Sequence, residues 1–135
     1  MKTIFVDANV FLRFFTVEDR GQHEQAAELF RQAAAGKVAL VTGPPVLFEI
    51  VWTLRSAYKQ TNAKMLDVVA AIAALPGLQL TDERTVEAAL ALAKASGQEF
   101  ADAYIASAAR QVGADEVATF NRKHFDRLGV SIHAV

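Results

Sequence analysis

The chain contains no cysteine among its 135 residues, which excludes disulfides, thiolate metal sites and thiol nucleophiles. Long apolar runs are also missing, since no window of about 18 residues is free of charge. The three prolines form no proline-rich tract, and no basic region leads into a signal-peptide core. We therefore expect one soluble, cytoplasmic domain over residues 1–135, without a membrane contact.

The chain also lacks an excess of positive charge. Its formal net charge is −1, so the whole molecule carries no electropositive field of the kind that draws proteins to nucleic acids. This balance counts against a general DNA-binding protein. It leaves a nuclease open, because a bound metal ion brings its own positive charge to the phosphate.

Strand-like and helical periods alternate along the sequence. Apolar, strand-like runs occur at residues 3–7 and 38–41, at the start of LQLTDERTV, and in EVATF and VSIHAV. Helical spacing of apolar residues fills the intervals, including residues 45–58, 63–75 and 100–112. Because these strands are apolar on both faces, we expect an α/β domain with three α/β/α layers around a mainly parallel sheet of about four or five strands.

Three acidic side chains stand at informative places. Asp7 ends the first strand, where ligands bind in open parallel sheets. Glu49 lies beside the apolar stripe of its helix, and Asp102 lies in the first turn of a core-like helix. Each has a structural alternative: a helix N-cap for Asp7, a solvated rim glutamate for Glu49, and a favourable helix-dipole contact for Asp102.

Together, these acids can converge on one edge of one sheet. Clustered carboxylates repel one another unless a hard cation lies between them, and oxygen ligands favour Mg²⁺ or Mn²⁺. Such an ion keeps positions open for water and for a substrate phosphate. It therefore suits hydrolysis of a phosphodiester bond.

These residues, in this order, resemble the PIN-domain family, and specifically the VapC-type ribonuclease toxins of toxin–antitoxin pairs. The matching segments are FVDANVFLRFF, VTGPPVLFEIVWTL and FADAYIASAARQVGADEVATFNRKHF. The resemblance implies a PIN-like domain and a metal-dependent endoribonuclease. It also implies that Asp7, Glu49 and Asp102 are catalytic, metal-binding acids, with Asn9 and Thr119 as supporting polar groups.

The sequence departs from the family at the fourth acidic position. Family members often carry an aspartate where this chain has Asn121 or His124. Asn121 can supply a carbonyl oxygen, but it lacks the charge that a second metal ion would require. His124 is a candidate ligand or proton donor, with a solvated, hydrogen-bonded histidine as the alternative.

The resemblance also implies partners. Unpaired RNA is the usual target of the family, and we expect Arg13, Arg122 and Lys123 to contact its backbone. A cognate antitoxin protein and a second copy of the chain, giving a homodimer, are further expected partners. The aromatic segment NVFLRFF supplies either core or a partner surface.

Three other interpretations remain open. The missing fourth carboxylate favours a degenerate PIN scaffold that binds RNA or a protein without cleaving. A haloacid-dehalogenase-like phosphatase also places an aspartate after its first strand, but it needs a second one at the position of Asn9. A receiver domain needs paired acids and a phosphoacceptor in mid-chain, where VALVTGPP offers neither.

Overall fold

The computed structural model describes residues 1–135 as seven helices and five short strands. In chain order these are β1 (Lys2–Phe5), α1 (Ala8–Thr16), α2 (Arg20–Ala34), β2 (Val38–Thr42), α3 (Pro44–Ser56), α4 (Asn62–Ala73), β3 (Leu78–Leu80), α5 (Glu83–Ser96), α6 (Phe100–Gln111), β4 (Val117–Ala118), α7 (Arg122–Arg127) and β5 (Ile132–His133). The alternation confirms the predicted α/β class. None of the helices is long and apolar enough to span a bilayer.

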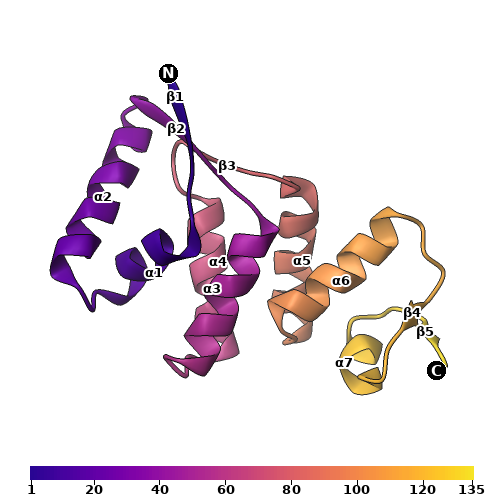
Figure 1. The fold of residues 1–135 in the computed structure, drawn as a ribbon. Helices are drawn as coiled ribbons and strands as arrows, with labels where there is room; N and C mark the ends of the chain where they lie inside the picture. The colour runs from indigo at the N-terminus through magenta and orange to yellow at the C-terminus, as the bar shows by residue number, and fades with distance from the viewer.

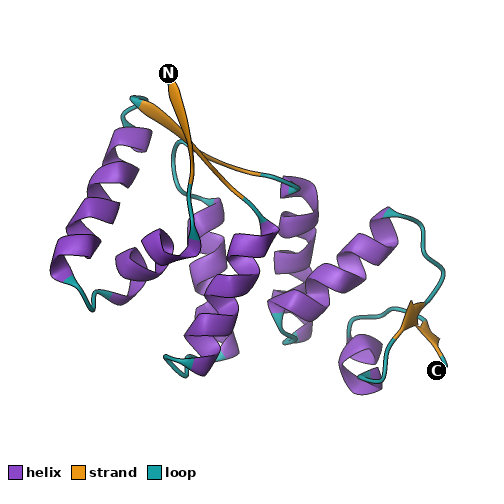
Figure 2. Ribbon diagram, viewed as in Figure 1, coloured by secondary structure: helices purple, strands orange, loops and turns teal.

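All strand pairs are parallel, as predicted, but the strands form two sheets. The larger sheet has the order β1-β2-β3, with Ile4 of β1 opposite Leu40 of β2, and Leu40 opposite Leu78 of β3. The smaller sheet pairs β4 with β5. Figure 2 shows the two sheets at opposite ends of the molecule. The sheet is thus divided into three strands and two.

Local sequence explains where several helices begin and end. The carboxylate of Asp19 accepts a hydrogen bond from the backbone N–H of Gln22 and caps α2, and Thr61 caps α4 in the same way through Lys64. Proline occupies the first turn of α3, where its missing N–H leaves no bond unmade. Helix α5 ends at Gly97, whose φ of 72° is readily adopted by glycine.

The core lies between the three-stranded sheet and the helices that follow its strands. Helix α2 packs against β2, whereas α4 and α5 pack against β3. The aromatic segment of α1 belongs to this core: Phe11 is fully buried and stacks on Phe30, with ring centroids 5.6 Å apart. Phe14 packs edge-on against the same ring at 4.9 Å. The core interpretation of NVFLRFF is therefore confirmed.

Residues 117–133, which we call the C-terminal unit, contribute little to that core. Of the 24 buried apolar residues, only Phe125 and Leu128 belong to this unit. Figure 1 shows the unit beyond α6, far from β1 and β2. It is attached to α6 by a hydrogen bond of 2.8 Å, which Nη2 of Arg110 donates to the carbonyl oxygen of Leu128.

Candidate functional site

Asp7 stands at the carboxyl end of β1, exposed to solvent. Its Oδ1 accepts a hydrogen bond of 2.7 Å from the backbone N–H of Ala8, so Asp7 caps α1. The other carboxylate oxygen accepts no hydrogen bond from the protein. Asp7 therefore has a structural role and also presents a free oxygen at the edge of the sheet.

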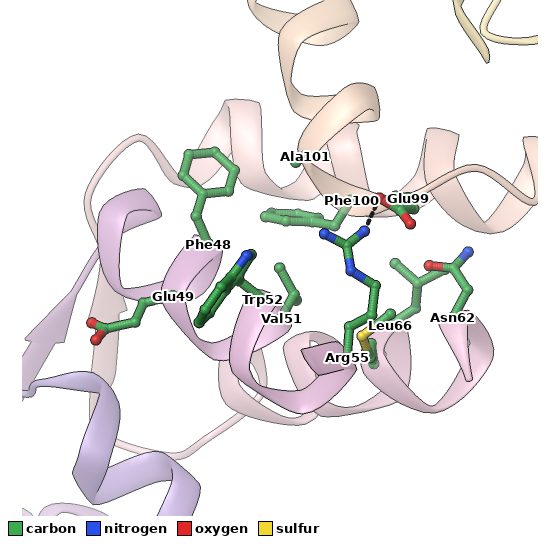
Figure 3. A pocket seen from close by; sticks show the side chains of 11 residues that line it. Phe48, Glu49, Val51, Trp52, Arg55, Asn62, Leu66, Glu99, Phe100 and Ala101 are labelled. Atoms are coloured by element: carbon green, nitrogen blue, oxygen red, sulfur yellow. Dashed lines mark hydrogen bonds and ion pairs between the residues drawn. The ribbon is translucent and has the colours of Figure 1, made fainter. Parts of the chain in front are cut away.

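Glu49 lies in the second turn of α3, the helix that follows β2. It is exposed and forms no ion pair. Figure 3 shows its carboxylate pointing away from Arg55 and Glu99, with Trp52 between. Since α3 packs against α1, Glu49 and Asp7 come from neighbouring helices.

Asp102 lies in the first turn of α6, where it contacts the C-terminal unit. Nδ1 of His124 is 3.1 Å from its Oδ2 and 2.8 Å from Nδ2 of Asn121. The Asp102 side chain is only 20% exposed. The sequence singled out Asp102, Asn121 and His124 separately, and the structure brings these three residues into contact through the His124 ring.

Within one chain, the structure does not bring the three acids together. No group of three potential ligands from Asp, Glu, His and Cys is close enough to hold a metal ion. Asp102 lies apart from Glu49 because its helix, α6, packs mainly along α5 and makes few contacts with α3, the helix that carries Glu49. The carboxylates are chemically suited to Mg²⁺, but their placement in a single chain does not form its site.

The supporting residues are divided in the same way. Asn9 is exposed on α1, beside Asp7. The hydroxyl oxygen of Thr119 accepts a hydrogen bond of 2.9 Å from the backbone N–H of Asn121, which shapes the turn into α7. Asn9 therefore accompanies Asp7 at the end of β1, whereas Thr119 belongs with the group around Asp102.

The basic residues expected to contact RNA differ in how free they are. Nε of Arg13 donates to Gln22 at 2.7 Å, and its guanidinium lies 3.6 Å from Glu18, so protein groups already occupy it. Arg122 and Lys123 are exposed on α7 and form no ion pair. Of the three, these two are available to a phosphate backbone.

A pocket of about 420 Å³, which no sequence motif predicted, lies between α3, α4 and the start of α6. Figure 3 shows the aromatic rings of Phe48, Trp52 and Phe100 along it, and the Arg55–Glu99 ion pair at its side. Trp52 is 62% exposed. The one available signal was this tryptophan, which lies one helical turn after Glu49 in a helix where most other apolar side chains are buried.

Two groups near this region have shifted pKa values. The hydrogen bond and negative charge of Glu99 raise the pKa of Arg55 above its ordinary value, so the guanidinium stays charged. Burial raises the pKa of the Tyr104 phenol, and the charge of Asp82 adds to the effect. Neither group is a proton donor near neutral pH.

The fold and these side chains define a class: an α/β domain whose parallel strands carry an aspartate at the carboxyl end of the first strand, with further acids on later helices. The family model described as PIN domain matches residues 4–130, and the chain belongs to this family. PIN domains are generally nucleases and often depend on divalent metal ions. No curated protein sequence matches the chain.

Proposed function

We propose that this protein is a VapC-like endoribonuclease that hydrolyses RNA phosphodiester bonds with Mg²⁺, or Mn²⁺, bound by Asp7, Glu49 and Asp102. The main support is the PIN family match over residues 4–130, which includes all three acids. The free carboxylate oxygen of Asp7 at the sheet edge agrees with this role. A bound divalent ion would activate a water and offset the charge of the phosphate.

The proposal extends to the partners. Arg122 and Lys123 are exposed beside Asn121 and can pair with the phosphates of an RNA strand. By the same resemblance, a cognate antitoxin protein would inhibit the enzyme, and the protein would form a homodimer. The pocket beside Trp52 is large enough for an apolar side chain of such a partner.

A second candidate is a PIN scaffold that binds RNA or protein without cleaving. The observation that favours it is the separation of the acids within one chain. Asn121 and His124 at the fourth position, in place of a carboxylate, point the same way.

Cleavage assays distinguish the two candidates. We expect the purified protein to cleave RNAs in a structured pool with Mg²⁺ or Mn²⁺ and to lose this activity when the metal is chelated. Asp7→Asn should lower the rate by at least about 100-fold, because it removes a charged ligand. The fold should survive, since the asparagine oxygen can still accept from the N–H of Ala8.

Asp67→Asn is the matched control, because Asp67 is an exposed helical aspartate outside the acid set. Its rate should equal that of the wild type. Unchanged cleavage by Asp7→Asn would contradict the assignment. Absence of cleavage with either metal, together with retained RNA binding, would support the scaffold.

A further inference from the structure

The first strand has an unpaired edge. β1 bonds only to β2 and lies at the end of the β1-β2-β3 order, so the backbone groups along its other side have no strand partner. Phe5, on this strand, is 61% exposed. An open edge with an exposed aromatic side chain is a template for another strand.

The C-terminal unit also has a strand edge without a partner. β4 and β5 have two residues each and pair only with each other, which leaves one side of β4 open. A two-stranded sheet this short is marginal alone in water. Phe120, two residues after β4, is 88% exposed. The strands β1 and β4 therefore each have an open edge and a largely exposed phenylalanine on or near them.

The charges beside the two strands match in a parallel alignment. β1 begins at Lys2 and is followed by Asp7, whereas β4 is preceded by Asp115 and followed by Arg122 and Lys123. Side by side in parallel, each end of β1 would meet the opposite charge. An antiparallel alignment would place like charges together. Parallel pairing also matches every other pair in the molecule.

Contacts within the chain hold the C-terminal unit away from its own β1. Arg110 bonds to the carbonyl of Leu128 at 2.8 Å, and His124 contacts Asp102 at 3.1 Å, so the unit is attached to α6. Helix α6 is in turn fixed to the body of the molecule by its long contact with α5. Closing on its own β1 would require breaking these contacts.

The start of α6 is anchored as well. The amide nitrogen of Asn62, on α4, donates to the carbonyl of Gln98 at 3.0 Å, and Arg55 on α3 pairs with Glu99. Gln98 and Glu99 lie within the turn from α5 to α6, so these bonds tie the turn to α3 and α4 and it is not a free hinge. A second molecule, by contrast, can approach β1 without any of these bonds changing.

We infer that two copies of this chain exchange their C-terminal units, with β4 of each copy pairing in parallel with β1 of the other. The exchange uses the same two edges twice and closes as a symmetric dimer. Each copy then gains a continuous five-stranded sheet of order β3-β2-β1-β4-β5. The open edges of β1 and β4 acquire a partner, and β3 and β5 become the outer strands of the sheet.

The exchange also assembles the site. The carboxyl ends of neighbouring parallel strands meet at one edge of a sheet, so the turn after β4, with Asn121, comes beside Asp7 of the other copy. Asp102 and His124 travel with it, because they contact one another. Each site thus combines Asp7 and Glu49 of one copy with Asp102, Asn121 and His124 of the other. Its catalytic meaning rests on the proposed function.

Cross-linking tests the exchange independently of activity. Because the chain has no cysteine, Thr3→Cys and Ala118→Cys can be introduced into separate preparations on the exposed residues of β1 and β4. The two variants are mixed, unfolded, refolded together and treated with a short bis-maleimide. We expect a cross-linked heterodimer on a denaturing gel.

Thr3→Cys with Lys94→Cys, an exposed position on α5, is the control and should give no heterodimer. The Thr3→Cys, Ala118→Cys double variant identifies closure within a chain, which would give a cross-linked monomer of altered mobility. A cross-linked monomer, or no cross-link, overturns the exchange.

Complementation tests the shared site. Asp7→Asn and Asp102→Asn chains, each of which should be inactive alone under the proposed function, are refolded together. Random pairing makes half of the dimers mixed, each with one intact site of two, so about a quarter of the wild-type activity should return. No return of activity, with the cross-link present, overturns the shared site. If the wild type never cleaves RNA but the cross-link forms, the proposed function fails and the exchange stands.

Discussion

At the residue scale, the contact between His124 and its neighbours limits what each group can do. A protonated Nδ1 can donate to Asp102, and an unprotonated Nδ1 can accept from the amide of Asn121, but one nitrogen cannot do both at once. A cation bound to Asp102 would compete with the N–H of His124 for the same oxygen. His124 is therefore placed to orient Asp102, which the sequence alone did not indicate.

Asn121 offers a direct test of the missing charge. It precedes α7 and its side chain caps no backbone N–H, so an aspartate can replace it without breaking a cap. We expect Asn121→Asp to lower the Mg²⁺ concentration for half-maximal cleavage by about tenfold, because a carboxylate attracts the ion more strongly than an amide. A titration of cleavage rate against Mg²⁺ measures this.

The neutral variant Asn121→Gln is the control, since it keeps an amide and adds no charge. Its Mg²⁺ requirement should not fall. Equal Mg²⁺ dependence of the aspartate and glutamine variants would mean that Asn121 does not face the metal, and would remove it from the site.

At the scale of elements, two glycines show what the turns require. Gly77 precedes β3 with a φ of +79°, and an added Cβ would lie 2.4 Å from the backbone oxygen of Ala33 on α2. Gly36, with a φ of +76°, has open space around the same position. The two sites share the backbone conformation and differ in the contact, so they form a matched pair.

We expect Gly36→Ala to lower the free energy of unfolding by about 1–2 kcal/mol, the cost of a left-handed alanine. Gly77→Ala should lower it by about 1–3 kcal/mol more, because α2 must also move away from β3. Urea unfolding followed by circular dichroism measures both values. If the two variants are equally stable, α2 can move away from the Gly77 turn at no cost in free energy, which would contradict this explanation.

Most elements were predictable because local signals agree with packing. The apolar spacing of α3 and the proline at its start predicted both its extent and its first turn, and Gly97 marked the end of α5. Helix α7 was missed, since its six residues are too few to show a helical period. Its presence matters, because it carries His124 to Asp102.

At the scale of the whole molecule, the sequence indicated the strands and the acids but not which strands would be neighbours. Strand periodicity reports which faces are apolar, whereas the partner of an edge is decided by long-range packing. The residues of β4 therefore looked like part of one sheet, and the structure places them in another. The same limit applies to the site. The sequence identified the acidic residues individually, but it did not predict that Asp102 lies apart from Asp7 and Glu49 within one chain.

The exchange predicts that stability depends on protein concentration and on the charges at the ends of β1. The urea midpoint should rise with concentration, since assembly favours the folded state. Lys2→Glu would face Asp115 of the other copy twice in each dimer, and we expect it to weaken dimerisation by about tenfold. Sedimentation equilibrium measures the dissociation constant.

Adding Asp115→Lys to Lys2→Glu restores opposite charges at the same place, so dimerisation should recover toward the wild-type value. Asp115→Lys alone should weaken the dimer, because it faces Lys2. A double variant as weak as the sum of the single ones would show that the two residues do not meet. Recovery is expected only if β1 and β4 run in parallel, since an antiparallel pair would place Asp115 beside Asp7 instead.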